Sequence, residues 1–208
     1  MSWIEVLVEG SSDVPAIREV LTRKFSLAEH EDFRIHAHQG RGNLPSDVFS
    51  KPGLKNRSLL NQLPAKLRGF STWFTKQHWV LVVIDADTTP CDELLRDLNA
   101  MLLKIPKPPR VLFAIAVEET ESWFIADTDA IKKAYPDANL SQLKKIVPDT
   151  VCGAWERLSE SIQARSKDKT TWAEKISPHL NLINPSSPSL KKMIEGIDRE
   201  IGTSAHHP

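Results

Sequence analysis

Apolar runs alternate with amphipathic stretches along the first two-thirds of the chain. Four runs have the alternating or continuously apolar pattern of strands, at residues 3–8, 33–40, 78–87 and 110–119. Four further stretches have apolar residues at helical spacing, at residues 13–27, 58–74, 91–105 and 120–135. The segment from Trp79 to Ile84 is apolar without a break, which is typical of a strand covered on both faces. Strands that alternate with helices predict an α/β fold with a mostly parallel four-stranded sheet flanked by helices.

Two prolines and their neighbours set the expected helix boundaries. Pro15 lies where it would help to start the helix at 13–27, with Ser12 or Asp13 as its cap. Pro64 lies inside the stretch 58–74, so this helix is expected to bend at Pro64 or to begin there.

The pattern changes after about residue 135. Helical segments are expected around residues 140–146, 155–165, 172–176 and 189–201, with no convincing strand among them. Polar turns, several of them rich in proline and serine, separate these segments. We therefore expect an α/β domain at residues 1–135 and a helical extension at residues 136–208 that packs on it.

Composition limits the classes to which the protein can belong. The 208 residues suffice for a sizeable core without disulfides. Cys91 and Cys152 lie far apart and in no metal-binding spacing, which suits a reducing cytoplasm. The start of the sequence has no basic segment and no apolar run long enough for a signal or a membrane span. The expectation is a cytoplasmic protein without a membrane partner.

Charge is balanced overall but not along the chain. The 27 basic and 27 acidic residues cancel, which argues against a generally basic nucleic-acid binder. No acidic residue lies between Asp47 and Asp85, whereas six basic residues do: Lys51, Lys55, Arg57, Lys66, Arg68 and Lys76. This segment is either a surface for phosphate groups or a solvated helix face. Under the first interpretation the nucleic-acid-binding candidates are Lys51, Lys55, Arg57 and, in the glycine-rich loop "GRGN", Arg41.

Carboxylates follow three of the four expected strands. They are Glu9 after the first strand, Asp85 and Asp87 at the end of the third, and Glu118, Glu119 and Glu121 after the fourth. Because parallel strands end at one edge of a sheet, these side chains are expected to converge. Oxygen-only clusters of like charge suit hard cations such as magnesium, manganese or calcium. Each carboxylate alone is also compatible with a solvated turn, and Asp85 and Asp87 point the same way only if the strand continues through both.

The segments "VEGSSD" (residues 8–13) and "IDAD" (residues 84–87) resemble the two signature motifs of the TOPRIM domain. That domain is a compact, Rossmann-like α/β fold shared by topoisomerases, bacterial primases, recombination mediators and OLD-family nucleases. The Glu-x-x-x-Asp spacing of Glu9 and Asp13 is similar to the OLD-like branch. The segments "HQGRGN", "EETESWFIAD", "SKDKTTWAEKI" and "NPSSPSLKKM" are similar to small stand-alone bacterial TOPRIM proteins, a group linked to genome or phage defence.

The resemblance implies roles for individual residues. The implied ligands of two Mg²⁺ or Mn²⁺ ions are Glu9, Asp13, Asp85, Asp87 and Glu121, with Glu118 and Glu119 as alternatives to Glu121. The implied catalytic residues are Glu9, Asp85, Asp87 and a late lysine near the scissile phosphate. Lys169 is the first candidate for this lysine and Lys167 is the alternative.

These expectations favour a metal-dependent nuclease that cleaves phosphodiester bonds of DNA or RNA. The alternative is a non-catalytic TOPRIM module that binds nucleic acid or a partner protein. The chain has no Walker A motif, so an ATPase partner would have to be encoded separately. A primase-like transferase is less favoured, because no zinc-binding module accompanies the motifs. The sequence does not predict the oligomeric state.

Overall fold

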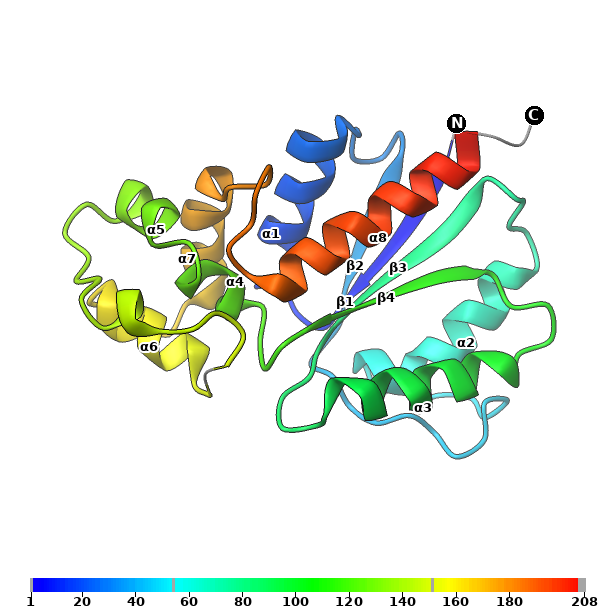
Figure 1. The fold of residues 1–208 in the computed structure, drawn as a ribbon. Helices are drawn as coiled ribbons and strands as arrows, with labels where there is room; N and C mark the ends of the chain where they lie inside the picture. The colour runs from blue at the N-terminus through cyan, green and yellow to red at the C-terminus, as the bar shows by residue number, and fades with distance from the viewer. Residues whose placement is uncertain (1, 54, 151, 206–208) are drawn as a thin grey trace.

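Four strands form the centre of the computed structural model, which describes residues 2–53, 55–150 and 152–205. The strands are β1 (Trp3–Val8), β2 (Phe33–Ala37), β3 (His78–Asp85) and β4 (Arg110–Ala116). They lie in the order β2-β1-β3-β4, and all neighbouring pairs are parallel (Figure 1). The predicted α/β fold with a four-stranded sheet is therefore confirmed, and the sheet is parallel throughout.

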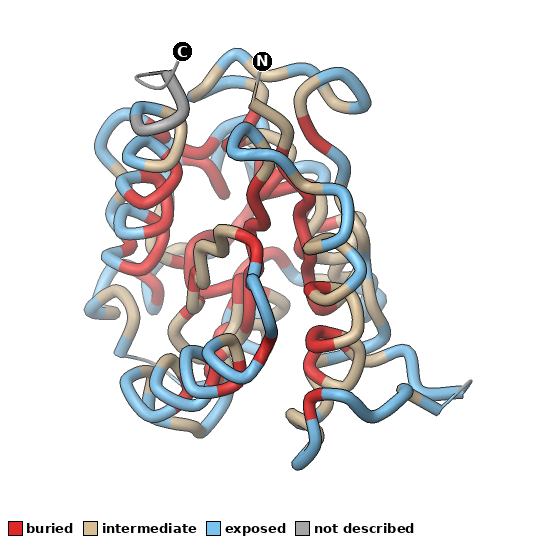
Figure 2. The backbone as a smooth tube through the Cα atoms, turned by 90° about the vertical axis from the view of Figure 1, so that its right-hand side faces the viewer, coloured by how far each residue is buried: buried red, intermediate tan, exposed pale blue. Residues whose placement is uncertain are grey.

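Helices cover both faces of this sheet. α2 (Leu59–Ser71) and α3 (Cys91–Leu103) pack on one face, and α1 (Val14–Glu19) and α8 (Pro188–Ala205) pack on the other (Figure 1). Successive buried residues of β3 enter the two cores in alternation: Trp79, Leu81 and Val83 on the α1 and α8 side, and Val80, Val82 and Ile84 on the α2 and α3 side. Burial on both faces explains the unbroken apolar run. Figure 2 shows the buried backbone through the middle of the molecule.

The first two helices differ in detail from the expected ones. α1 is followed directly by a π-helical turn at Val20–Lys24. α2 begins at Leu59 and continues through Pro64, so of the two alternatives for Pro64 a helix start is excluded. The buried stripe of Leu59, Leu60, Leu63 and Leu67 holds α2 against the sheet, and tertiary packing of this kind outweighs the cost of an internal proline.

Short helices follow β4 and gather at the carboxyl end of the sheet (Figure 1). The expected helix at 120–135 is two helices, α4 (Glu121–Ile125) and α5 (Thr128–Ala134). The chain starts a new helix at this point because the Asp127 carboxylate accepts a hydrogen bond from the Ala130 backbone N–H (3.0 Å).

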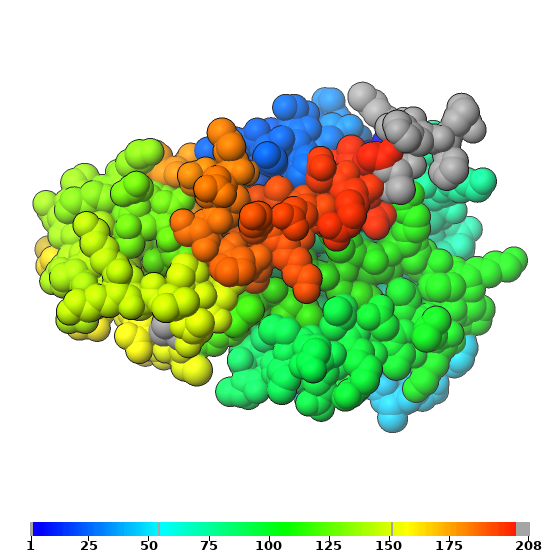
Figure 3. Space-filling view, in the orientation of Figure 1, coloured from blue at the N-terminus to red at the C-terminus, as the bar shows by residue number. Residues whose placement is uncertain are grey.

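The remaining elements are η2 (Leu143–Lys145), α6 (Ala154–Ser161), α7 (Lys169–Ile176) and η3 (Ser177–His179). The stretch at 140–146 forms only the 3-10 turn η2, so the helix expected there is wrong. α7 begins earlier than expected, because the Asp168 carboxylate accepts from the Thr171 backbone N–H (3.1 Å). α8 packs against β4, and in the space-filling view its orange-red to red surface adjoins the green surface of the segments around α3 and β4 (Figure 3). The domain boundary near residue 135 stays a prediction, and none of the described helices is long and apolar enough to cross a membrane.

Candidate active site

Three loops meet at the carboxyl edge of the sheet and bring carboxylates together. Glu9 directly follows β1, and its Oε1 accepts a hydrogen bond from the backbone N–H of Asp85, the last residue of β3 (2.9 Å). Asp13 lies before α1, and its Oδ1 accepts from the hydroxyl of Thr120, which follows β4 (2.8 Å). Side chains that are 76 and 107 residues from their partners therefore join the three loops.

Of the two possible caps of α1, Ser12 and Asp13, Asp13 lies at the cap position but does not cap the helix with its side chain. Its Oδ2 accepts instead from the Gly10 backbone N–H (2.9 Å), while Thr120 donates to the other oxygen. Asp13 is 4% exposed, so these two donors hold a buried carboxylate at the edge of the sheet.

The condition under which Asp85 and Asp87 would point the same way is not met, because the strand does not continue through both. β3 ends at Asp85, and Asp87 has a left-handed backbone with φ 47°. Asp85 is partly buried, and its Oδ1 is inaccessible and has no hydrogen-bond partner among the described residues. The Asp87 side chain is 54% exposed and lies at the rim.

Lys169, the first residue of α7, brings a positive charge to the cluster. Its ammonium lies 3.4 Å from Glu121, which is 3% exposed, and 3.0 Å from Glu119. Burial alone would lower the pKa of Lys169, but Glu121 and Glu119 outweigh it and the pKa is raised. Lys167 is exposed, and its ammonium lies 5.0 Å from the ring centre of Trp155. Of the two alternative lysines, the structure therefore brings Lys169 to the carboxylates.

The ionised forms of the edge carboxyls are destabilised where they lie. Burial raises the pKa of Glu9 to about 8 and the pKa of Glu121 to about 7. Burial also raises the pKa of Asp13 and holds the pKa of Asp85 well above its usual range, and neighbouring negative charges add to the effect at Asp85. A cation placed among these oxygens would reverse the effect. Clusters of shifted carboxyls in one place are typical of functional sites.

Glu5, inside β1, shows how the same protein holds a buried carboxylate with a structural role. Glu5 is 5% exposed, accepts a hydrogen bond from Trp3 Nε1 (3.0 Å) and pairs with His36 Nε2 (2.5 Å). Burial acts to raise the pKa of Glu5, but the two partners outweigh it and the pKa is lowered. The pKa values of the edge carboxyls shift upward instead. Both kinds of carboxyl are buried, but at the edge the hydrogen-bond and charge partners do not outweigh burial.

We expect Glu5→Gln to lower the free energy of unfolding at pH 7 by about 1 kcal/mol, because the charged hydrogen bonds to Glu5 are lost. The folded pKa of Glu5 is below its ordinary value of 4.5, so its contribution is complete above about pH 4.5 and is lost as the pH falls through the folded value. Urea unfolding of both proteins from pH 7 to pH 3 measures this, with exposed Glu174→Gln as the control. A stability difference that grows toward pH 3 would contradict the assignment.

The chemistry of the cluster fits a hard divalent cation. The side-chain atoms that could bind a metal ion are carboxylate oxygens, which Mg²⁺ and Mn²⁺ prefer as ligands. The unpartnered Oδ1 of Asp85 is an oxygen that a cation would satisfy. Among the described residues, no three His, Cys, Asp or Glu side chains are already placed around one metal position. Glu9 and Glu121 are instead engaged by the Asp85 N–H and by Lys169.

Arg41, in the loop after β2, also reaches this edge. Its guanidinium donates to the backbone oxygen of Ala86 (2.9 Å), to Asp87 Oδ2 (3.0 Å) and to the hydroxyl of Thr89 (2.8 Å). Arg41 thus ties the loop after β2 to the loop after β3 and neutralises the exposed Asp87.

The other three basic candidates have exposed side chains, and the backbone of one of them is tied to the loop after β2. The carbonyl of Arg57 accepts from the Gln39 backbone N–H (3.0 Å), so the chain returns to the edge there, while the Arg57 side chain is exposed. Lys51 and Lys55 are exposed, and their side chains make no hydrogen bond or ion pair within the described ranges. Their predicted contact with nucleic acid stays a prediction.

Gly42 allows the loop that carries Arg41 to lie against α2. Its φ is 67°, and a Cβ there would lie 2.2 Å from Asn61 Oδ1 and 2.2 Å from Ser58 Oγ. The same Asn61 oxygen accepts from the Asn43 backbone N–H (3.0 Å). Any side chain at Gly42 would therefore disturb the contact that fixes this loop.

Gly42→Ala is expected to destabilise the protein by about 2 to 4 kcal/mol, because left-handed strain adds to the steric overlap. Gly40→Ala is the matched control, because Gly40 has φ 84° but a Cβ there meets nothing within 4 Å. The control should cost only about 1 kcal/mol. Denaturant unfolding of both variants measures the difference, and equal losses would exclude a role for the overlap.

A family model described as "Domain of unknown function (DUF4276)" matches residues 8–198. The chain belongs to the DUF4276 family. The matched range contains all the edge residues, from Glu9 to Lys169. No curated protein matches the sequence.

Three solved structures share the fold of this DUF4276 chain. All three are of the C-terminal region of the OLD protein of Xanthomonas campestris pv. campestris, phased with iodine, mercury and platinum. Each is 14% identical to the chain, with TM-scores of 0.50, 0.51 and 0.50. The matches cover 100%, 99% and 99% of this chain and 99%, 99% and 97% of the other. At this identity the likeness shows the fold alone.

Two further residues of the DUF4276 chain lie at the edge although the motifs in its sequence do not point to them. Thr120 is 1% exposed and donates to Asp13, and Trp155 lies with its ring centre 5.3 Å from the ammonium of Lys169. The position of Thr120, directly before Glu121, was a usable signal. Trp155 had no such signal, because the sequence places it only within an amphipathic helical segment at residues 155–165.

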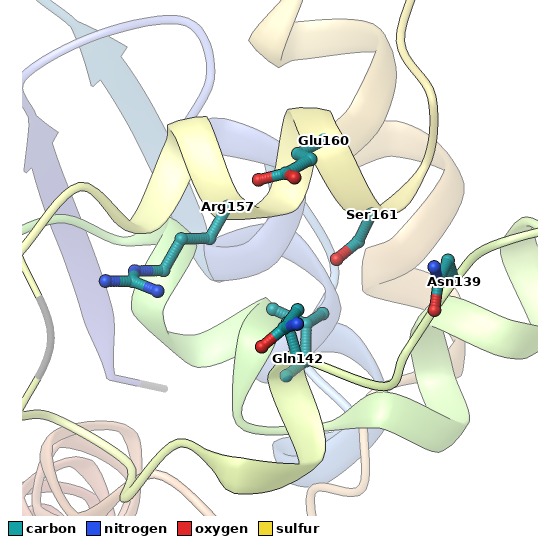
Figure 4. Close-up of a pocket in the computed structure, with 6 residues that line it drawn as sticks. Asn139, Gln142, Arg157, Glu160 and Ser161 are labelled. Atoms are coloured by element: carbon teal, nitrogen blue, oxygen red, sulfur yellow. The ribbon is translucent and has the colours of Figure 1, made fainter.

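A polar pocket of about 210 Å³ lies away from these carboxylates, between η2 and α6 (Figure 4). It is lined by Asn139, Gln142, Leu143, Arg157, Glu160 and Ser161. None of these residues belongs to the carboxyl edge, so this pocket is not part of the candidate site.

Proposed function

We propose that this protein is a metal-dependent nuclease of the TOPRIM type, of the OLD-like branch, that cleaves phosphodiester bonds of DNA or RNA in genome maintenance or phage defence. The observation that carries the proposal is a cluster of carboxyls with raised pKa beside a lysine: Glu9, Asp13, Asp85 and Glu121 next to Lys169. Glu5 is the structural contrast, because its two partners outweigh burial and lower its pKa, whereas the partners of the edge carboxyls do not. The fold shared with the C-terminal region of an OLD protein supports the proposal.

The roles follow from the positions of the side chains. The residues that would hold two Mg²⁺ or Mn²⁺ ions are Glu9, Asp13, Asp85 and Glu121, with Asp87 at the rim. The bound metal would polarise the phosphate and lower the pKa of a water molecule. Glu9, whose Oε1 accepts the Asp85 N–H at the edge, would bind the metal or act as a general acid or base. Lys169 would donate to a phosphate oxygen next to the carboxylates.

One observation favours a second candidate function, a non-catalytic module that binds nucleic acid or a partner protein such as a separate ATPase. Lys169 already pairs with Glu119 and Glu121, and no three metal-binding side chains of the described residues surround one point. An internal ammonium of this kind would be sufficient to hold the edge together in a binding module. The two candidate functions differ in whether the protein cleaves the phosphodiester bond when metal is bound.

Cleavage of single-stranded DNA, plasmid DNA and RNA with Mn²⁺ or Mg²⁺ tests the proposal, comparing the wild type with Asp85→Ala/Asp87→Ala. We expect cleavage that requires the metal and that is lost in the folded double variant. Equal cleavage by the two proteins would overturn the proposal. No cleavage by the wild type, together with nucleic-acid binding that survives in the double variant, would favour the binding module.

A further inference from the structure

Glu118, two residues beyond β4, has a left-handed backbone with φ 63°, which is uncommon for a residue with a side chain. Its carbonyl accepts a hydrogen bond from the backbone N–H of Asp87 (2.9 Å), which is itself left-handed with φ 47°. The N–H of the preceding residue, Ala86, donates to the carbonyl of Ala116, the last residue of β4 (2.9 Å). Two consecutive N–H groups after β3 therefore bind carbonyls that are two residues apart, at the end of β4 and just beyond it. The left-handed Asp87 therefore does not continue the strand that ends at Asp85.

The carbonyl of Glu118 binds the loop after β3, whereas its carboxylate reaches the start of α6 and caps this helix. Gly153, at the N-cap position of α6, has no side chain with which to do so. One oxygen of Glu118 accepts from the Gly153 N–H and the other from the Ala154 N–H (3.0 Å). The free N–H groups and the dipole at a helix N-terminus favour a carboxylate there. Glu118 is thereby engaged by backbone donors rather than free to bind a metal.

The helix that Glu118 caps supports Lys169. Trp155, in the first turn of α6, lies with its ring centre 5.3 Å from the Lys169 ammonium. The Trp155 backbone N–H donates to Glu119 (3.4 Å), whose other oxygen pairs with Lys169 (3.0 Å). α6 and α4 pack side by side at the carboxyl end of the sheet (Figure 1). A displacement of α6 would therefore move the support of Lys169.

We propose that Glu118 is a positioning residue that couples the placement of Asp87 to the placement of Lys169. Its carbonyl holds the backbone N–H of the exposed aspartate, and its carboxylate holds the helix that supports the lysine. This inference rests on the proposed function, because it gives Asp87 and Lys169 roles at the same metal and phosphate site. It assigns Glu118 to neither metal ligation nor catalysis.

Backbone strain explains why the carboxylate is needed. A non-glycine residue in the left-handed region costs about 1 to 2 kcal/mol and persists only where its surroundings hold it. Glu118 and Asp87 share one hydrogen bond, and the contacts of the Glu118 carboxylate with α6 hold this pair from outside. Without the carboxylate, the pair loses its support from α6, and α6 loses its cap.

Isothermal titration with Mn²⁺ tests the inference on the full chain, with Glu118→Gln and Glu118→Gly. Glutamine keeps one acceptor oxygen, whereas glycine keeps the left-handed backbone and loses the cap. We expect the Kd for Mn²⁺ to rise about tenfold in Glu118→Gly and less in Glu118→Gln, as for loss of a group that orients a metal ligand. Glu156→Gln is the matched control, since Glu156 is an exposed glutamate in the first turn of α6.

Thermal unfolding in EDTA separates positioning from general stability. A lower Tm with an unchanged Kd for Mn²⁺ would overturn the inference and leave Glu118 a structural cap only. An unchanged Kd in both Glu118 variants, with wild-type binding abolished by Asp85→Ala, would overturn the positioning role but not the proposed function. A wild type that does not bind Mn²⁺ would overturn both. If Glu118→Gly does not fold, the Kd of Glu118→Gln decides.

Discussion

Asp85→Asn is expected to make the metal-free protein more stable while it abolishes metal-dependent cleavage. Oδ1 of Asp85 is inaccessible and unpartnered, and burial together with the charges of Asp13 and Glu9 holds its pKa well above the usual range. Asparagine has nearly the same shape, carries no charge, and can donate from its amide to the neighbouring carboxylates. The substitution therefore removes an ionisable group that lowers the stability of the metal-free protein but that the proposed function requires.

The stability gain at pH 8 without metal should be about 1 to 3 kcal/mol, and cleavage should fall by about a thousandfold or more. Thermal unfolding in EDTA measures the first effect, and single-turnover cleavage with Mn²⁺ measures the second. Asp137→Asn, an exposed aspartate, is the control and should change neither. A large loss of stability in Asp85→Asn would show that the carboxylate has a structural role and would contradict the assignment.

Lys169→Met is expected to lower both cleavage and stability, whereas Lys167→Met should change little. The Lys169 ammonium lies 3.4 Å from Glu121, which is 3% exposed, and methionine would leave that carboxylate without its counter-charge. Lys167 contacts the ring of Trp155 from an exposed position and makes no ion pair among the described residues. The two lysines are two residues apart, so each is the matched control of the other.

For Lys169→Met we expect about a hundredfold slower cleavage and a loss of about 1 to 3 kcal/mol of unfolding free energy at pH 8. The stability loss should shrink as the pH falls below the Glu121 pKa of about 7, because Glu121 is then protonated and needs no counter-charge. Single-turnover rates and urea unfolding at pH 8 and pH 5.5 measure both effects. A larger loss of cleavage in Lys167→Met would reverse the choice between the lysines.

Much of the fold follows from local pattern. The unbroken apolar run from Trp79 to Ile84 predicts a strand buried on both faces, and alternation of such runs with amphipathic stretches predicts the parallel sheet. Helix boundaries were less predictable. Propensity places a break at Pro64, but packing of the leucine stripe of α2 against the sheet overrides it.

The sequence by itself determined that carboxylates gather at one edge, because Glu9, Asp85 and Glu121 follow strands that run in the same direction. Only the tertiary structure decided what each does there. Asp87 leaves the strand with a left-handed backbone whose N–H donates to the Glu118 carbonyl, and Lys169 rather than Lys167 reaches the cluster from the start of α7, which packs against α1 and α5. Such choices depend on contacts between residues far apart in the chain, which strand and helix periodicity do not encode.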